Sequence, residues 1–175
     1  MSADIDSSGY REFRTVLGHL PTGVTVITSA VDNRAVGMAV GTFASISLDP
    51  PLVGFFVART STTWPQVRAS GGFCANVLGA GQEDLCRSFA RSGGDKFAGV
   101  AWSRSASGRP RLAQVVAWVD CSIEQVCDAG DHELCIGRVQ DLGTTSPEGL
   151  AGGPLIFYRG DFGALSEEFV GGSCP

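Results

Sequence analysis

The chain has 175 residues, of which 43% are hydrophobic and 18% are charged. This length favours a single compact domain, and the apolar fraction excludes an intrinsically disordered chain. The formal net charge of -5 opposes broad electrostatic attraction to nucleic acid or to anionic lipid. We therefore expect neither nucleic acid nor membrane as a partner, although a few arginines and backbone N–H groups are enough to bind one phosphate.

The N-terminal residues 1–9 are acidic and polar, without the basic and apolar regions of a signal peptide. The most apolar stretch, residues 51–58, is too short to span a bilayer. We expect a cytoplasmic protein with reduced cysteines, since none of the six stands in a C-x-x-C pair. With only two histidines the chain lacks zinc-ligand spacing, and no metal site is predicted.

Periodicity and turn signals predict three short helices among many short strands. The first helix, residues 10–20, has Ser7 or Ser8 as its cap and Pro21 at its end. The other helices are expected over 62–69 and 82–91, and a long loop over 92–110. Strands are expected over 24–31, 35–42 (after a turn at Asp32-Asn33), 52–58, 73–78, 154–158, and in a long hairpin of 114–127 and 133–141 with its tip at 128–132.

This order of elements favours a mainly β fold, a barrel closed on itself with helices covering its openings. We divide the chain into a disordered N-terminal tail (1–9), one folded domain (10–165) and a C-terminal tail (166–175) that frays.

Three polar clusters could carry chemistry. Residues 37–47 are rich in glycine, alanine and hydroxyl side chains, so a ligand could approach the backbone, but taken alone they are better explained by a glycine-containing strand and a Pro-Pro turn. Residues 59–63, Arg-Thr-Ser-Thr-Thr before a helix, fit either a phosphate cradle or an ordinary helix cap. Residues 129–132 place His132 beside an aspartate at a hairpin tip, where it either contacts a ligand or is inert.

The common nucleotide motifs are absent. Gly79-Ala-Gly81 lacks the third glycine of the dinucleotide-binding fingerprint, and there is no P-loop. There is also no nucleophile elbow of the G-x-S-x-G type. A nucleotide can therefore bind only by a route other than those folds.

Taken together and in order, nine short stretches resemble the flavin reductase-like family, which contains the reductase components of two-component flavin-dependent monooxygenases. The resemblance covers roughly residues 12–163. Each motif is weak alone, and their fixed order makes the match specific. The matching stretches are 13–28 (with Pro21-Thr-Gly-Val24), 37–38, 43–52, 59–63, 73–78, 82–89, 96–100, 129–132 (Ala129-Gly-Asp-His132) and 154–160.

The resemblance implies a six-stranded antiparallel Greek-key split barrel that forms a homodimer, with flavin near the dimer interface. It implies an NAD(P)H:flavin oxidoreductase that passes hydride from a reduced nicotinamide, NADH favoured over NADPH, to FMN or FAD. The reduced flavin would then diffuse to a partner monooxygenase.

The resemblance also implies site residues. Lining the flavin ring and the ribityl chain would be Met38, Ala39, Val40, Gly41, Thr42, Ala44 and Ser45. Surrounding the ribityl chain and phosphate would be Arg59, Thr60, Ser61, Thr62, Thr63 and Trp64, with Phe89 and Arg91 closing the site. His132 is the predicted catalytic residue on the nicotinamide side, with Tyr158 and Arg159 near the same pocket.

The chain departs from the family pattern at Ala39-Val-Gly-Thr42, where members often have Thr-x-Asn-Ser, so fewer side-chain hydrogen bonds to the flavin ring are implied. The choice between FMN and FAD stays open at this point. Two other functions are compatible with such a barrel: a non-catalytic flavin-binding or sensing module, and an enzyme like pyridoxamine-phosphate oxidase. The Gly-Asp-His tip argues against the first, and the lack of a basic phosphate cluster against the second.

Overall fold

The structure is a computed structural model that describes residues 7–145 and 153–165. It is mainly β, as expected from the sequence. The helices are α1 (Ser7–Leu17), α2 (Trp64–Ala69) and α3 (Glu83–Ala90). The strands are β1 (Thr22–Gly23), β2 (Thr25–Val31), β3 (Arg34–Val40), β4 (Ala44–Leu48), β5 (Pro51–Ala58), β6 (Gly72–Val77), β7 (Trp102–Arg104), β8 (Pro110–Leu112), β9 (Ala117–Ala129), β10 (His132–Thr144), β11 (Leu155–Tyr158) and β12 (Asp161–Ala164).

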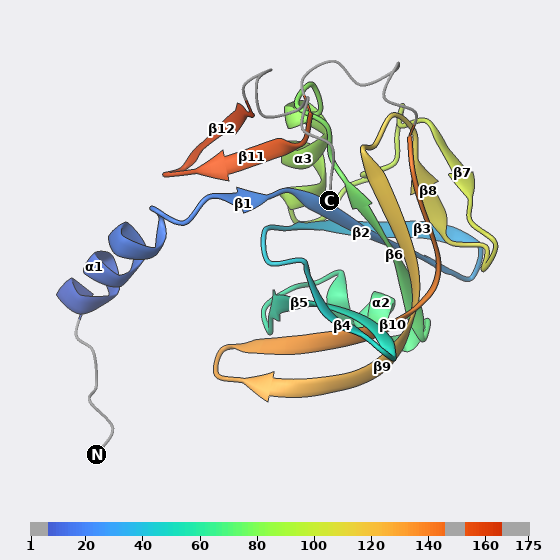
Figure 1. The fold of residues 1–175 in the computed structure, drawn as a ribbon, viewed down its shortest axis with the longest axis horizontal. Helices are drawn as coiled ribbons and strands as arrows, with labels where there is room; N and C mark the ends of the chain where they lie inside the picture. Colours follow the sequence, from blue (N-terminus) through green and yellow to red (C-terminus); the bar gives the residue numbers. More distant parts are fainter. Residues whose placement is uncertain (1–6, 146–152, 166–175) are drawn as a thin grey trace.

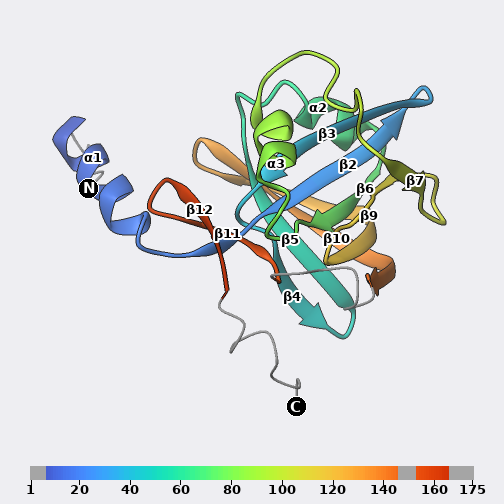
Figure 2. The ribbon, with the colours of Figure 1, turned by 90° about the horizontal axis from the view of Figure 1, so that it is seen from above.

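The main sheet has seven antiparallel strands in the order β3-β2-β6-β9-β10-β5-β4. It curves strongly, so that the long β9–β10 hairpin lies across from β2 and β3 (Figure 1). Figure 2 shows the same sheet from above, with α2 and α3 on its β2–β3 side and α1 projecting away from the body.

The expectation of a fully closed barrel is wrong for the part of the chain that is described. Strands β3 and β4 are the two edges of the main sheet, and no ladder joins them within residues 7–145 and 153–165. A side chain bridges part of the gap: the Thr42 hydroxyl, just after β3, accepts a hydrogen bond from the Phe56 N–H (2.9 Å) and donates one to the Phe56 carbonyl (3.2 Å) on β5. Local sequence patterns do not determine such long-range pairing.

Most element boundaries agree with the sequence-based expectations to within a few residues. The Asp32-Asn33 turn joins β2 to β3 with positive φ at both residues (48° and 62°), as a tight hairpin requires. Helix α1 begins at Ser7, earlier than expected, and ends at Leu17. After Gly18 the N–H groups of His19 and Leu20 donate to carbonyls three residues back, which ends the α-helical pattern. The disordered N-terminal tail predicted over 1–9 is wrong at residues 7–9, which belong to α1, while residues 1–6 and the predicted C-terminal tail at 166–175 lie outside the described residues.

Besides β1 and β4, three short strands were not predicted. β7 and β8 form a two-stranded sheet whose first strand falls in the expected long loop. β12 pairs with β11, and β11 pairs with β1, in a third sheet. These strands have three or four residues each, too few for a period-two pattern to stand out.

The two faces of the main sheet carry separate cores. One core packs around Phe55, Phe73 and Trp64, and the other around Phe89 and Leu78. The described cysteines form no disulfide; Cys174 lies outside the described residues. Burial raises the pKa of Cys74, Cys121 and Cys135 to about 12, so these thiols behave as small apolar groups. No helix in the described parts of the chain is long and apolar enough to cross a bilayer.

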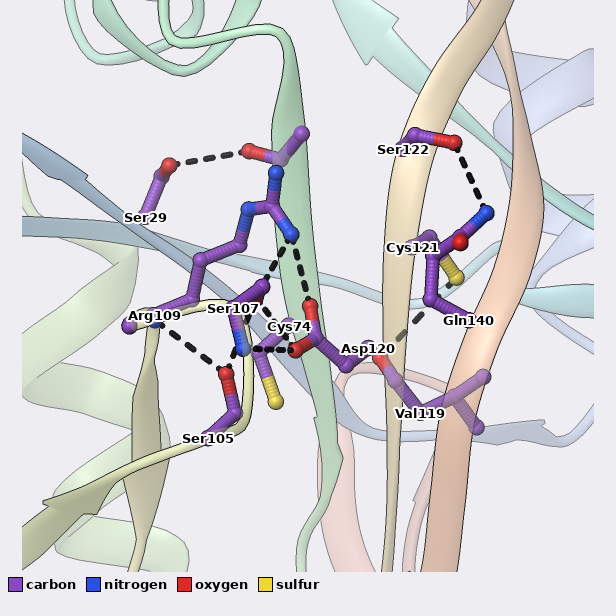
Figure 3. Close-up of polar contacts among 12 residues, drawn as sticks. Ser29, Cys74, Ser105, Ser107, Arg109, Val119, Asp120, Cys121, Ser122 and Gln140 are labelled. Carbon is purple, nitrogen blue, oxygen red and sulfur yellow. Dashed lines mark hydrogen bonds and ion pairs between the residues drawn. The ribbon is translucent and has the colours of Figure 1, made fainter.

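A buried ion pair attaches the β7–β8 hairpin to the main sheet (Figure 3). Arg109, just before β8, donates from Nη1 to Oδ1 of Asp120 on β9 at 2.9 Å. Ser107 also donates to the Asp120 carboxylate, whose side chain is 1% exposed. Burial by itself raises the pKa of Asp120, but hydrogen bonds from the serine hydroxyls and Arg109 outweigh it and hold that pKa below its ordinary value.

Candidate functional site

A cleft of about 1210 Å³ opens where five parts of the chain meet. These are α1, the end of β3, the end of β5 with the hydroxyl-rich segment after it, the end of α3, and the tip of the β9–β10 hairpin. Its lining residues are Tyr10, Phe13, Arg14, Leu17, Met38, Ala39, Val40, Gly41, Thr42, Phe56, Val57, Ala58, Thr60, Ser61, Thr62, Thr63, Phe89, Ala90, Arg91, Ser92, Lys96, Ala129, Asp131 and His132.

The wall from β3 is close-packed against α3. A Cβ added at Gly37 would lie 2.7 Å from the Phe89 ring, so only glycine at this position lets that ring lie against the strand. Met38 follows, largely buried, and its sulfur accepts a hydrogen bond from the Ser61 hydroxyl (3.6 Å). The floor of the cleft is therefore apolar, and it is held by contacts between β3, α3 and the hydroxyl segment.

The hydroxyl segment, residues 60–63, leads from β5 into α2. Ser61 accepts a hydrogen bond from the Trp64 N–H (3.2 Å), so it serves the turn into the helix. The Thr60 and Thr62 hydroxyls make no hydrogen bond within the described residues. Both residues line the cleft, and their hydroxyls can donate to or accept from a bound polar group.

Lys96 is the only lysine in the chain, and it links three walls of the cleft. Its Nζ donates to the carbonyls of Gly37 (3.1 Å) and Phe89 (3.1 Å) and to the Thr63 hydroxyl (3.4 Å). It forms no ion pair within the described residues, and burial lowers its pKa below the ordinary lysine value. A cation without a carboxylate partner therefore borders the cleft.

The hairpin tip brings His132 to the cleft beside the end of β5, where it pairs with Ala58. Its Nδ1 and the Asp131 Oδ1 are 2.7 Å apart, and this hydrogen bond lowers the pKa of Asp131. That contact engages Nδ1, and Nε2 has no hydrogen-bond partner in the described part of the chain. His132 is 43% exposed, so a ligand in the cleft can reach it.

Twelve of the residues implied by the resemblance line this cleft together. They come from three segments distant in sequence and from the hairpin tip: Met38, Ala39, Val40, Gly41, Thr42, Thr60, Ser61, Thr62, Thr63, Phe89, Arg91 and His132.

Arg59 and Trp64 do not line the cleft. Arg59 contacts the hairpin instead. Its guanidinium Nη2 lies 2.5 Å from the Asp128 carboxylate, and its Nε donates to the Gly130 carbonyl. The backbone N–H of Arg59 donates to the Asp131 carbonyl. Trp64 is 3% exposed in the core and donates its indole N–H to Glu133. The side chains of both residues bind protein partners outside the cleft. They therefore stabilise the elements that form the cleft.

Ala44, Ser45, Tyr158 and Arg159 also lie outside the cleft of the single chain. Ala44 and Ser45 are exposed on the edge strand β4. Tyr158 packs edge-on against His19, and the Arg159 N–H donates to the Gly18 carbonyl, because β11 pairs with β1 rather than with the hairpin.

Sequence reasoning missed the contribution of α1 and of Lys96. The helix presents Tyr10, Phe13 and Leu17 to the cleft while these side chains stay more than two-fifths exposed. An amphipathic helix without an intramolecular partner was the available signal. Lys96 begins one of the nine matching stretches, 96–100, but the sequence alone assigned no role to its side chain.

The fold and the cleft define a mainly β protein with one large cofactor-sized cleft that is walled by backbone, hydroxyl and aromatic groups. A family model described as flavin reductase like domain matches residues 17–166, and the chain belongs to this family.

The chain is similar to several characterised relatives. It is 44% identical over 158 residues to the reductase subunit HsaB of a flavin-dependent monooxygenase from Rhodococcus jostii, covering 90% of this chain and 79% of that protein. It matches the crystal structure of a nitrilotriacetate monooxygenase component B homologue from Mycobacterium thermoresistibile (TM-score 0.89, 39% identity, 93% and 90% coverage). It also matches an NADH:FAD oxidoreductase from Streptomyces globisporus solved with NAD and FAD fragments (TM-score 0.85, 32% identity, 94% and 97% coverage).

Proposed function

We propose that this protein is an NAD(P)H:flavin oxidoreductase, with NADH favoured, that reduces FMN or FAD and supplies reduced flavin to a separate monooxygenase. The observation that carries the proposal is the cleft, which gathers the residues expected at a flavin from distant segments around one space that His132 also lines. The names of the relatives, a monooxygenase reductase subunit and an NADH:FAD oxidoreductase, support the same activity. The curved sheet is, in this proposal, a split barrel, and the cytoplasmic location expected from the sequence stays a prediction.

The cleft suits a flavin by its size and its chemistry. About 1210 Å³ exceeds the roughly 300–1,000 Å³ of ordinary small-molecule sites, so a second ligand fits beside the first. The apolar floor at Met38 and Phe89 matches a flat aromatic ring. The hydroxyls of Thr60 and Thr62, with Arg91 nearby, match a polyhydroxyl chain ending in a phosphate.

The protein's part in the reaction is to bind and align, because a bound flavin supplies the redox chemistry and accepts hydride from a reduced nicotinamide. The β3 backbone, packed against the buried Phe89 ring, would hold one face of the flavin ring. The side chain of His132 would hold the nicotinamide nucleotide through Nε2, since Asp131 engages Nδ1. Phe13 and Leu17 of α1 would exclude water from the outer side of the cleft.

The direct test is anaerobic mixing of the purified protein, FMN or FAD, and NADH, followed by the same titration with NADPH. We expect the flavin absorbance to bleach with NADH, and oxygen to restore it. A protein that binds flavin but bleaches with neither nicotinamide would be a flavin carrier, and the proposed function would be wrong.

His132→Ala is expected to raise the KM for NADH several-fold while flavin affinity stays nearly unchanged. Loss of one neutral hydrogen bond is worth about 0.5–1.5 kcal/mol, and of one to a charged phosphate about 1.5–3 kcal/mol. Steady-state kinetics gives KM, and fluorescence titration gives the flavin Kd. His132→Asn keeps a donor without the charge, so the pH profile of kcat/KM separates the two cases. A variant that keeps its NADH kinetics and loses FMN would reverse our placement of the two ligands.

The protein is expected to be a homodimer in solution. Helix α1 projects from the body (Figures 1 and 2), and Phe13 and Val16 on it are 56% and 60% exposed although they are apolar. Two copies can cover such a surface in a symmetric contact. Light scattering should give twice the chain mass of 18.2 kDa. A monomer mass at micromolar concentration with flavin bound would contradict this expectation.

A further inference from the structure

A second cavity of about 740 Å³ adjoins the cleft. It is formed by the Asp32-Asn33 turn, the first half of β3, one side of α2 and the loop that follows α3. The two cavities share Thr62, Thr63 and Lys96 in their linings. The second cavity is therefore a continuation of the cleft past its hydroxyl segment. Its volume lies within the range of small-molecule sites.

The shared wall carries the unpaired cation described above. The Lys96 Nζ lies at 3.4 Å from the Thr63 hydroxyl, and no carboxylate pairs with it among the described residues. A positive charge held between two cavities, beside the free hydroxyl of Thr62, is the electrostatic complement of phosphate groups that pass from one cavity into the other.

Beyond the shared wall the chemistry changes. Asp32 and Arg34 border the second cavity from one side, and Asp95 borders it from the other, so its outer part carries no net positive charge. The charges in this outer part therefore disfavour the binding of further phosphate groups there. Carboxylates accept hydrogen bonds from ribose hydroxyls and from exocyclic amino groups. Space remains on the loop side, because a Cβ added at Gly93 or Gly94 would meet nothing within 4 Å.

We propose that the second cavity is the subsite for the adenosine monophosphate half of FAD, with the pyrophosphate beside Lys96 and the adenosine against β3 and the loop after α3. This inference rests on the proposed function, because it places the flavin half of the same molecule in the cleft. FMN would end at the shared wall and leave the second cavity to solvent. The subsite therefore separates the two flavins, and the wild-type protein binds FAD more tightly than FMN.

The test is to fill the cavity from β3 without touching the cleft. Ala35 lines the second cavity and not the first, so Ala35→Phe puts a ring where the adenosine would lie. Arg34→Trp does the same from an exposed position, where substitutions rarely prevent folding. Ala106→Phe is the matched control, because Ala106 is exposed and lines neither cavity. Circular dichroism checks folding, and fluorescence titration gives Kd for FMN and for FAD.

We expect Ala35→Phe and Arg34→Trp to raise the Kd for FAD at least tenfold, with the Kd for FMN within twofold of wild type and Ala106→Phe without effect on either. An unchanged ratio of the two Kd values overturns the subsite, whether both flavins bind as before or both weaken equally. If the wild-type protein binds neither flavin, the proposed function itself fails, and that result is distinct from an unchanged ratio.

Discussion

Replacing Arg109 by leucine is expected to lower the free energy of unfolding by about 3–5 kcal/mol, because it leaves a buried carboxylate without its cation. Asp120 is 1% exposed and Arg109 only 16%, so water cannot replace the lost partner (Figure 3). Urea denaturation at neutral pH measures the change. The control is Arg138→Leu, which removes an ion pair to Glu124 whose side chains are 42% and 34% exposed, and it should cost less than about 1 kcal/mol. Equal losses of unfolding free energy in the two variants would mean that the buried ion pair contributes no more to stability than the exposed one.

The same pair gives a pH dependence with a definite sign. The pKa of Asp120 in the folded protein lies below its ordinary value of 3.8. A carboxyl group with a depressed pKa contributes stability that is complete above the ordinary value and is lost as the pH falls through the folded value. Stability should therefore fall on acidification below about pH 4. Asp120→Asn should be less stable than wild type at neutral pH. Its stability should then fall less on acidification, because the contribution of the Asp120 carboxyl group is absent.

Phe89→Ala is expected to destabilise the protein by about 3–5 kcal/mol and to weaken flavin binding. The ring is fully buried, packs edge-on against Phe97 at 5.0 Å between centroids, and lies against Gly37. Its removal leaves a cavity beside Gly37 and Phe97 at the wall of the cleft. Denaturation gives the stability, and flavin titration below the unfolding range gives the affinity. Phe157→Ala serves as the control, since Phe157 is 39% exposed and lies outside the cleft, and it should cost clearly less. A stable Phe89→Ala protein with normal flavin affinity would refute both parts.

The sequence predicted most of the elements because their signals are local. The Asp32-Asn33 turn, the long hairpin and the helix before Arg91 each follow from spacing within a few residues. The open edge between β3 and β4 and the short strands β7, β8 and β12 depend on pairing between distant segments, and no local pattern encodes them.

For the site, the same difference decides which of the expected residues line the cleft. Met38 and Thr62 could be assigned to one cleft because the order of the motifs resembles a family. Arg59 looks like a phosphate ligand by residue type, and only the structure shows that Asp128 and the hairpin backbone already occupy it. Lys96 reaches the cleft through tertiary packing alone.

The attachment of Arg59 to the hairpin has a thermodynamic consequence. Arg59 precedes the hydroxyl segment directly, and it binds Asp128, Gly130 and Asp131, which precede His132. The hydroxyl segment, expected to hold the flavin, and His132, expected to hold the nicotinamide, are thus connected through Arg59 and form one structural unit. If the first ligand orders that unit, the second ligand loses less entropy on binding. The resulting cooperativity is reciprocal: by whatever factor bound flavin strengthens nicotinamide binding, bound nicotinamide strengthens flavin binding by the same factor.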